Sequence, residues 1–255
     1  MQVTVLGSSS FFPSLRRSWT SLFLNLGGGD AVLVDAGSWR LMTFRADILH
    51  TNRVYITHNH PDHTGFIGAL VRRMRRQNRT RPLTIFCPTD TVQRLHHFIR
   101  IFNHNKIPLF VQIHPFTPDI PRTIDHLSSS QTEVKAAAAC HTTLTAAYAF
   151  CQGDKRIIIS PDTGPRCPTL LTLARGANAW FHDCTFATGR LLSIRKGHST
   201  PQNAGGDAAR ANVKALILIH ISGLRLRNPR AIVAAARLHF NGEIYIAKDG
   251  MSFNF

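Results

Sequence analysis

Short apolar runs of strand length alternate with polar turns in the first part of this chain. The segments predicted to be strands are residues 3–6, 21–26, 31–35, 53–57 and 83–87. Three glycines followed by Asp30 supply a hairpin turn between the second and third of these strands. Residues 65–76 place apolar side chains at helical spacing, and residues 91–102 do the same, so both segments are predicted to be helices.

The second half of the chain repeats this order of elements. Strands are predicted at residues 133–140, 146–151, 156–160, 179–182, 215–219 and 243–247, and helices at 169–175, 201–212 and 229–239. Two such halves bury their apolar faces by packing sheet against sheet with the helices outside. The predicted fold class is therefore α/β, a four-layer αββα sandwich. Because no linker divides the chain, we expect one domain over residues 1–255.

Composition narrows the class of protein further. Hydrophobic residues make up 44% of the chain, enough for a sizeable core, but no apolar run approaches the roughly 20 residues that cross a bilayer. The first residues lack the basic and apolar segments of a signal peptide, so we expect a cytoplasmic protein without membrane contact. The five cysteines are odd in number and form no Cys-x-x-Cys pair, so we expect them to be reduced and mostly buried.

The charge of the chain is strongly positive, with a formal net charge of +16 at pH 7. Such a field attracts polyanions such as nucleic acids, although a genome that favours arginine codons would leave the same excess. Six arginines lie within residues 72–81, a segment called here the arginine cluster. This cluster is either a nucleic-acid contact or a solvated helix end.

Four side chains able to bind a metal ion follow the strand predicted at residues 53–57. They are His58, His60, Asp62 and His63. On a loop, His58 and His60 would point the same way, while Asp62 and His63 would reach a neighbouring position. Imidazole and carboxylate suit zinc and similar ions, so this segment predicts ligands for two metals.

Three more candidate ligands follow predicted strands. His141, Asp162 and His220 each come after an apolar run, where α/β proteins usually gather functional groups. Each taken alone would more often be a capping or buried polar residue. Together with the histidine segment they make a set of five histidines and two aspartates, enough for two metal sites.

This spacing resembles the signature of the metallo-β-lactamase superfamily over nearly the whole chain. The resemblance implies that His58, His60 and His141 hold one metal ion, that Asp62, His63 and His220 hold a second, and that Asp162 bridges them. It also implies that Asp35 supports the site without binding a metal. The expected cofactors are two divalent ions, Zn²⁺ or alternatively Mn²⁺.

Finer matches resemble the ribonuclease Z branch of that superfamily. They are the glycine-serine loop at residues 6–18, residues 182–186, Gly197 to Thr200, and residues 216–222. The departing oxygen of a phosphodiester needs a proton, and a histidine that binds no metal suits that task. We therefore assign proton donation to His198, its orientation to Asp183, and acceptance of the proton of the attacking water to Asp62. His182 is interpreted as a structural residue beside the site.

The chain departs from ribonuclease Z at three places. The long arm that grips tRNA in that family lies between the equivalents of His141 and Asp162, which here are separated by only twenty residues. Residues 36–40 lack the family's usual Glu-Gly-Thr-Gln continuation, and Asp183 stands where the family has glutamate. Arg225, Arg227 and Arg230 follow His220 and are candidate contacts for the substrate phosphate.

These observations predict a metal-dependent phosphodiesterase that activates water with two metals, most simply an endoribonuclease acting near RNA 3′ ends. A hydrolase of a small cyclic phosphodiester is the first alternative, and a lactone or thioester hydrolase on the same metals is the second. A third alternative is a non-catalytic RNA-binding module, which the complete set of candidate metal ligands disfavours. The expected partner is RNA or a small phosphodiester, and a homodimer is compatible with the sequence.

Overall fold

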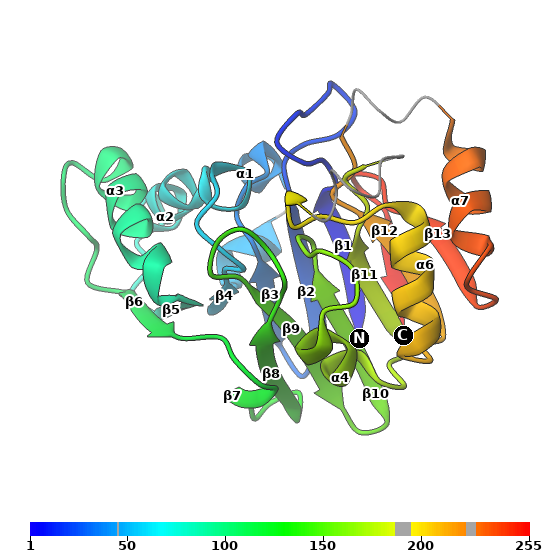
Figure 1. Cartoon of the computed structure of the whole chain (residues 1–255). Helices are drawn as coiled ribbons and strands as arrows, with labels where there is room; N and C mark the ends of the chain where they lie inside the picture. Colours follow the sequence, from blue (N-terminus) through cyan, green and yellow to red (C-terminus); the bar gives the residue numbers. More distant parts are fainter. Residues whose placement is uncertain (45, 187–194, 223–227) are drawn as a thin grey trace.

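The computed structural model describes residues 1–44, 46–186, 195–222 and 228–255 and contains two seven-stranded β-sheets (Figure 1). In the first sheet the strand order is β14-β1-β2-β3-β4-β5-β6. These strands are β1 (Gln2–Gly7), β2 (Ser21–Gly27), β3 (Asp30–Val34), β4 (Arg53–Tyr55), β5 (Leu83–Pro88), β6 (Val111–Phe116) and β14 (Ser252–Asn254). Pairing is antiparallel from β14 to β3 and parallel from β3 to β6.

The second sheet repeats this plan in the order β13-β12-β11-β10-β9-β8-β7. Its strands are β7 (Arg122–Leu127), β8 (Thr132–Ala138), β9 (Ala146–Gln152), β10 (Lys155–Ser160), β11 (Ala179–Asp183), β12 (Ala215–Ile219) and β13 (Glu243–Ile246). Pairing is antiparallel from β7 to β10 and parallel from β10 to β13. The last strand of the chain, β14, returns to pair with β1 of the first sheet.

Three apolar layers hold these elements together. One layer lies between the sheets and includes Leu24, Tyr148 and Phe181. The outer face of the first sheet packs against α2 (Ile67–Arg76) and α3 (Val92–Phe102), and that of the second packs against α4 (Pro168–Ala174), α6 (Pro201–Arg210) and α7 (Pro229–Arg237). Figure 1 shows these two groups of helices on opposite sides of the paired sheets. The predicted four-layer αββα sandwich is therefore confirmed.

Local sequence explains where the helices begin and which face they bury. In α2 the apolar side chains of Ile67, Leu70 and Met74 are buried, while the arginines between them are more exposed. In α6 the Thr200 hydroxyl accepts a hydrogen bond from the backbone of Asn203, whose side chain bonds back to Thr200. This capping box fixes the start of α6 at Pro201, close to His198 in the sequence.

Three edge strands were not predicted from the sequence. Strands β6, β7 and β14 each stand at or next to a sheet end, and most of their side chains are exposed or only half-buried. An edge strand has a partner on one side only, so its apolar pattern is weak. The segment predicted as a loop at His63 also differs, since residues Pro61–Thr64 form the short helix α1.

The expectation of five reduced cysteines was wrong for one pair. Cys140 and Cys167 form a disulfide, with their Cα atoms 5.5 Å apart. Cys87, Cys151 and Cys184 are free, and Cys151 is half-buried. The disulfide ties the segment after β8 to the start of α4, a long-range pairing that no local spacing announces. No helix in the described parts of the chain has the length and apolar character needed to cross a membrane.

Candidate metal centre

The candidate ligands gather where strand ends from both sheets meet. His58 follows β4 of the first sheet, and His141, Asp162 and His220 follow β8, β10 and β12 of the second. His220 has a φ of 59°, a left-handed conformation that turns its side chain as the strand ends. A non-glycine residue in this region is strained, and such strain is often found at functional sites.

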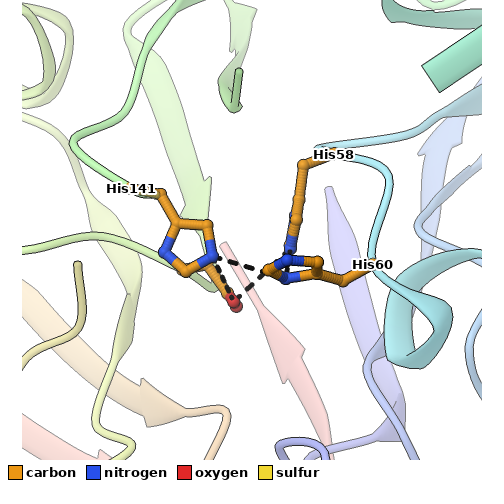
Figure 2. Close-up of side chains that lie close together, drawn as sticks. His58, His60 and His141 are labelled. Atoms are coloured by element: carbon orange, nitrogen blue, oxygen red, sulfur yellow. Dashed lines mark hydrogen bonds and ion pairs between the residues drawn. The ribbon is translucent and has the colours of Figure 1, made fainter. Parts of the chain in front are cut away.

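Three histidines and one aspartate form the first group, called here site A. The Nε2 atom of His58 lies 2.8 Å from Nδ1 of His60, which lies 3.4 Å from Nε2 of His141. Oδ2 of Asp162 lies 3.6 Å from both His58 and His141. Figure 2 shows the three histidine rings turned toward one another from two separate loops.

Asp62, His63, His220 and the other oxygen of Asp162 form the second group, called here site B. The Nε2 atom of His220 lies 3.2 Å from Oδ2 of Asp62 and 3.3 Å from Nε2 of His63. Oδ1 of Asp162 lies 3.1 Å from His220 and 3.3 Å from His63. One oxygen of Asp162 therefore faces each site.

The two groups fit divalent metal ions. A tetrahedral site with bonds of about 2.0–2.1 Å places its ligand atoms roughly 3.3 Å apart, close to the spacings in both groups. Oδ1 of Asp162 is buried, yet it makes no hydrogen bond of acceptable geometry. A buried carboxylate oxygen without a donor is costly unless a cation satisfies it. Two carboxylates and five imidazoles, most of them buried, also match the chemistry of zinc ligands.

Four of the five histidines have their second ring nitrogen held by a neighbour. Nδ1–H of His63 donates to Asp35 (2.7 Å), and Nδ1–H of His141 donates to the Gly197 carbonyl (2.8 Å). The Thr57 hydroxyl donates to Asp35, so its oxygen accepts from His58 (3.0 Å).

His220 is held in the same way by Thr185, a residue that was not predicted to support the site. The Thr185 hydroxyl donates to Asp183 (2.7 Å), and its oxygen accepts from Nδ1–H of His220 (2.8 Å). Each of these four imidazoles is thereby fixed in the tautomer that presents Nε2 to its site. Thr185 lies in the segment 182–186 that resembles ribonuclease Z, but neither it nor Thr57 was assigned a role. Threonine is common, and the histidine that Thr185 orients lies far along the chain.

The charges of the ligands depend on one another. Burial lowers the pKa of His63, but Asp162, Asp35 and Asp62 outweigh it and hold that pKa well above its usual value. Burial, reinforced by His141, lowers the pKa of His60 to about 4. Without a metal, the carboxylates therefore draw a proton onto His63. A bound divalent cation would supply that positive charge in place of the proton.

His198 and Asp183 form an ion pair beside the two sites. Nδ1 of His198 lies 2.7 Å from Oδ2 of Asp183 and 4.0 Å from Oδ2 of Asp162. Burial lowers the pKa of His198, but the Asp183 carboxylate outweighs it and raises that pKa to about 9. His198 lines a cavity of about 530 Å³ together with Asp62, Asp162 and His220. The pair therefore borders the cavity that contains the candidate metal ligands, and its roles as proton donor and orienting carboxylate stay predictions.

The remaining predicted residues lie farther from the metals or outside the described residues. Nδ1–H of His182 donates to the Asp183 carbonyl, and its Nε2 lies 3.7 Å from Asp207 of α6, so the ring faces the helix layer. Arg225 and Arg227 fall outside the described residues, and Arg230 is exposed at the start of α7.

Half of the arginine cluster has a structural task. Arg72 donates to the Phe102 carbonyl, Arg73 to the Leu41 carbonyl and Arg79 to the Leu49 carbonyl. These guanidinium groups hold neighbouring segments together and are committed to backbone acceptors. This favours the solvated helix end over the nucleic-acid contact for these three arginines.

Gly197→Ala should weaken metal binding about 10- to 100-fold, the usual effect of disturbing a group that orients a metal ligand. Gly197 has a φ of +64°, and a Cβ there would lie 2.8 Å from Cα of His141. The Gly197 carbonyl would have to move, and it orients the His141 ring. Competition with a chromophoric zinc chelator measures the affinity.

Gly153→Ala is the matched control, because Gly153 has a similar φ of +59° but nothing within 4 Å of the added Cβ. It should bind zinc as the natural chain does. Equal zinc affinities of the two variants would contradict this role of Gly197.

Comparison with known proteins points to one family. The model of the Beta-lactamase superfamily domain matches residues 30–221. Ribonuclease Z of Halorubrum lacusprofundi is 27% identical over 305 residues, covering 98% of this chain and 96% of that protein. Ribonuclease Z of Methanothermobacter thermautotrophicus is 27% identical over 292 residues, covering 94% and 92%. Both alignments are longer than this chain, so these relatives carry segments that it lacks.

Solved structures give the same fold. The short form of human tRNase Z superposes with a TM-score of 0.82 at 22% identity, covering 100% of this chain and 99% of that one. The metallo-β-lactamase fold protein YhfI from Bacillus subtilis gives a TM-score of 0.82 at 22% identity, covering 99% and 98%. The family model matches most of the length of this chain, and side-chain groups at its strand ends fit metal ions. This chain therefore belongs to the β-lactamase superfamily and is a metal-dependent hydrolase.

Proposed function

We propose that this chain is a phosphodiesterase that cleaves RNA near a 3′ end and holds two divalent metal ions. The single observation that carries the proposal is the arrangement around Asp162. Its two oxygens face two ligand groups, and the ion pair of His198 and Asp183 borders the same cavity. Paired metals with a separate proton donor suit the hydrolysis of an ester whose leaving group is poor.

Each side chain has a separate task in this proposal. His58, His60 and His141 would hold one ion and Asp62, His63 and His220 the other, with one oxygen of Asp162 facing each group. When bound, the ions supply positive charge that makes a water molecule more acidic and offsets the charge of the phosphate. Asp62, which lines the cavity, accepts the proton of the attacking water. His198 donates a proton to the departing oxygen, and Asp183 orients its ring.

RNA is the favoured substrate because the protein is strongly basic and because of the relatives it resembles. A formal charge of +16 raises the local concentration of a polyanion. The similar proteins include enzymes named ribonuclease Z and a tRNase Z, each matched over nearly the full length of this chain.

A small cyclic phosphodiester is the second candidate substrate. Between His141 and Asp162 the chain forms only the hairpin of β9 and β10, with no extended arm to grip a large RNA. The cavity of about 530 Å³ is also of a size that encloses a small ligand.

A substrate panel tests the proposal. Protein loaded with zinc or manganese is assayed on bis(p-nitrophenyl) phosphate, precursor tRNA, nucleoside cyclic phosphates and a lactone. We expect hydrolysis of the phosphodiesters, with higher kcat/KM on RNA than on cyclic phosphates. Higher kcat/KM on the cyclic phosphates would select the second candidate. Turnover of the lactone alone would overturn the phosphodiesterase assignment.

A further inference from the structure

Two exposed phenylalanine side chains line the cavity that contains the candidate metal ligands. Phe11 and Phe12 follow β1 in the loop over residues 8–20, and their exposed fractions are 54% and 56%. Both line the cavity of about 530 Å³ that also contains His198 and Lys196. Figure 1 shows this loop standing above the ends of the two sheets. Exposed aromatic rings lose the stabilisation that burial would give them, so their position calls for a reason.

Hydrogen bonds and ring contacts within this loop hold the two phenylalanine rings in place. The Ser9 hydroxyl donates to the Phe12 carbonyl (2.9 Å), and the Trp19 indole N–H donates to the Phe11 carbonyl (3.1 Å). The ring of Phe11 stacks on Trp19 with an interplanar angle of 23°, and Phe12 meets Phe11 edge to face. Ser9 also approaches the carbonyl of Ile221, the residue after His220. The rings therefore have a defined position relative to the metal ligands.

The chemistry of the cavity selects the kind of group that these rings meet. Its lining combines candidate metal ligands and Lys196, which suit a phosphate, with the aromatic rings of Phe11, Phe12 and Phe186. A nucleotide joins a phosphate to a flat aromatic base through one sugar, so it can meet both kinds of side chain at once. Stacking of a base on an aromatic ring tolerates any sequence, because every base has a π-face.

We propose that Phe11 and Phe12 form a stacking platform for the nucleobase beside the phosphate that is cleaved. The inference rests on the proposed phosphodiesterase function and adds that the substrate is a nucleotide ester. The platform binds the base without reading its identity. It supplies part of the substrate binding that the long arm supplies in ribonuclease Z.

Two substrates with the same scissile bond test this platform. One is the p-nitrophenyl ester of thymidine 5′-phosphate, and the other is the same ester of abasic deoxyribose 5′-phosphate. For the metal-loaded natural chain we expect a kcat/KM about 10-fold higher on the ester that carries the base, as base stacking on an aromatic ring allows. For the double variant Phe11→Ala and Phe12→Ala the ratio should fall close to one, with hydrolysis of the abasic ester retained.

Further variants separate stacking from folding and from general apolar contact. Leu15→Ala is the matched control, because Leu15 is 101% exposed in the same loop but does not line the cavity. It should keep the natural ratio. Tyrosine at positions 11 and 12 should also keep it, whereas leucine at both should lower it.

The outcomes distinguish this inference from the function on which it rests. Equal kcat/KM on both esters for the natural chain would overturn the platform and leave the phosphodiesterase assignment standing. No hydrolysis of either ester, or of any phosphodiester in the substrate panel, would overturn both.

Discussion

Asp162→Ala should reduce the metal content of the purified protein from about two divalent ions per chain to fewer than one. Asp162 is the residue that both ligand groups share, since Oδ2 faces His58 and His141 while Oδ1 faces His63 and His220. Its loss also removes the negative charge that offsets two cations. Elemental analysis after metal-replete purification measures the content, and phosphodiesterase activity should disappear with the metals.

Two further variants separate loss of the bridge from loss of the fold. His220→Ala removes a ligand of site B alone, so about one ion per chain should remain. Asp162→Asn keeps the shape of the side chain without its charge, and it should still fold while holding less metal than the natural chain. Circular dichroism checks the fold of each variant. If Asp162→Ala retained two ions per chain, Asp162 would not be the bridge. Loss of both ions from all three variants alike would also contradict that assignment.

Much of this arrangement was predictable because strand ends are predictable. Apolar runs placed β4, β10 and β12 within one or two residues of their observed bounds, and the candidate ligands follow these strands in the sequence. Parallel strands carry the groups at their carboxyl ends to one edge. Side chains far apart in sequence, such as Asp62 and His220, could therefore be placed together before any contact was known.

The supporting contacts were not predictable, because they depend on geometry between distant segments. Thr185 contacts Asp183 and His220, and Gly197 contacts His141, through single hydrogen bonds that leave no periodic pattern. The cavity aromatics show the same limit. Phe11 and Phe12 line the metal cavity although they lie far along the chain from His198 and His220.

His198→Ala should keep near-natural metal content. Its rate on RNA should fall about 10²- to 10⁴-fold, the usual effect of removing a general acid from a reaction whose leaving group is poor. Its loss on bis(p-nitrophenyl) phosphate should be much smaller, because p-nitrophenolate departs largely without a proton. His198 lines the cavity, and Nδ1–H donates to Asp183 over 2.7 Å, which leaves Nε2–H as the proton to give. Initial rates on both substrates, with metal content measured on the same samples, give the two ratios.

The choice of companion variant follows from the contacts of Asp183. Asp183 also accepts hydrogen bonds from the backbone of Thr163 and from Thr185, and Thr185 holds His220. Asp183→Asn would therefore disturb a metal ligand as well as the His198 ring. His198→Gln is the cleaner companion, because glutamine retains an N–H for Asp183 but cannot act as an acid at neutral pH. It should show the same selective loss on RNA as alanine. Equal losses on both substrates, with both metals still bound, would make His198 a residue that positions the substrate and would leave the departing oxygen without an assigned proton donor.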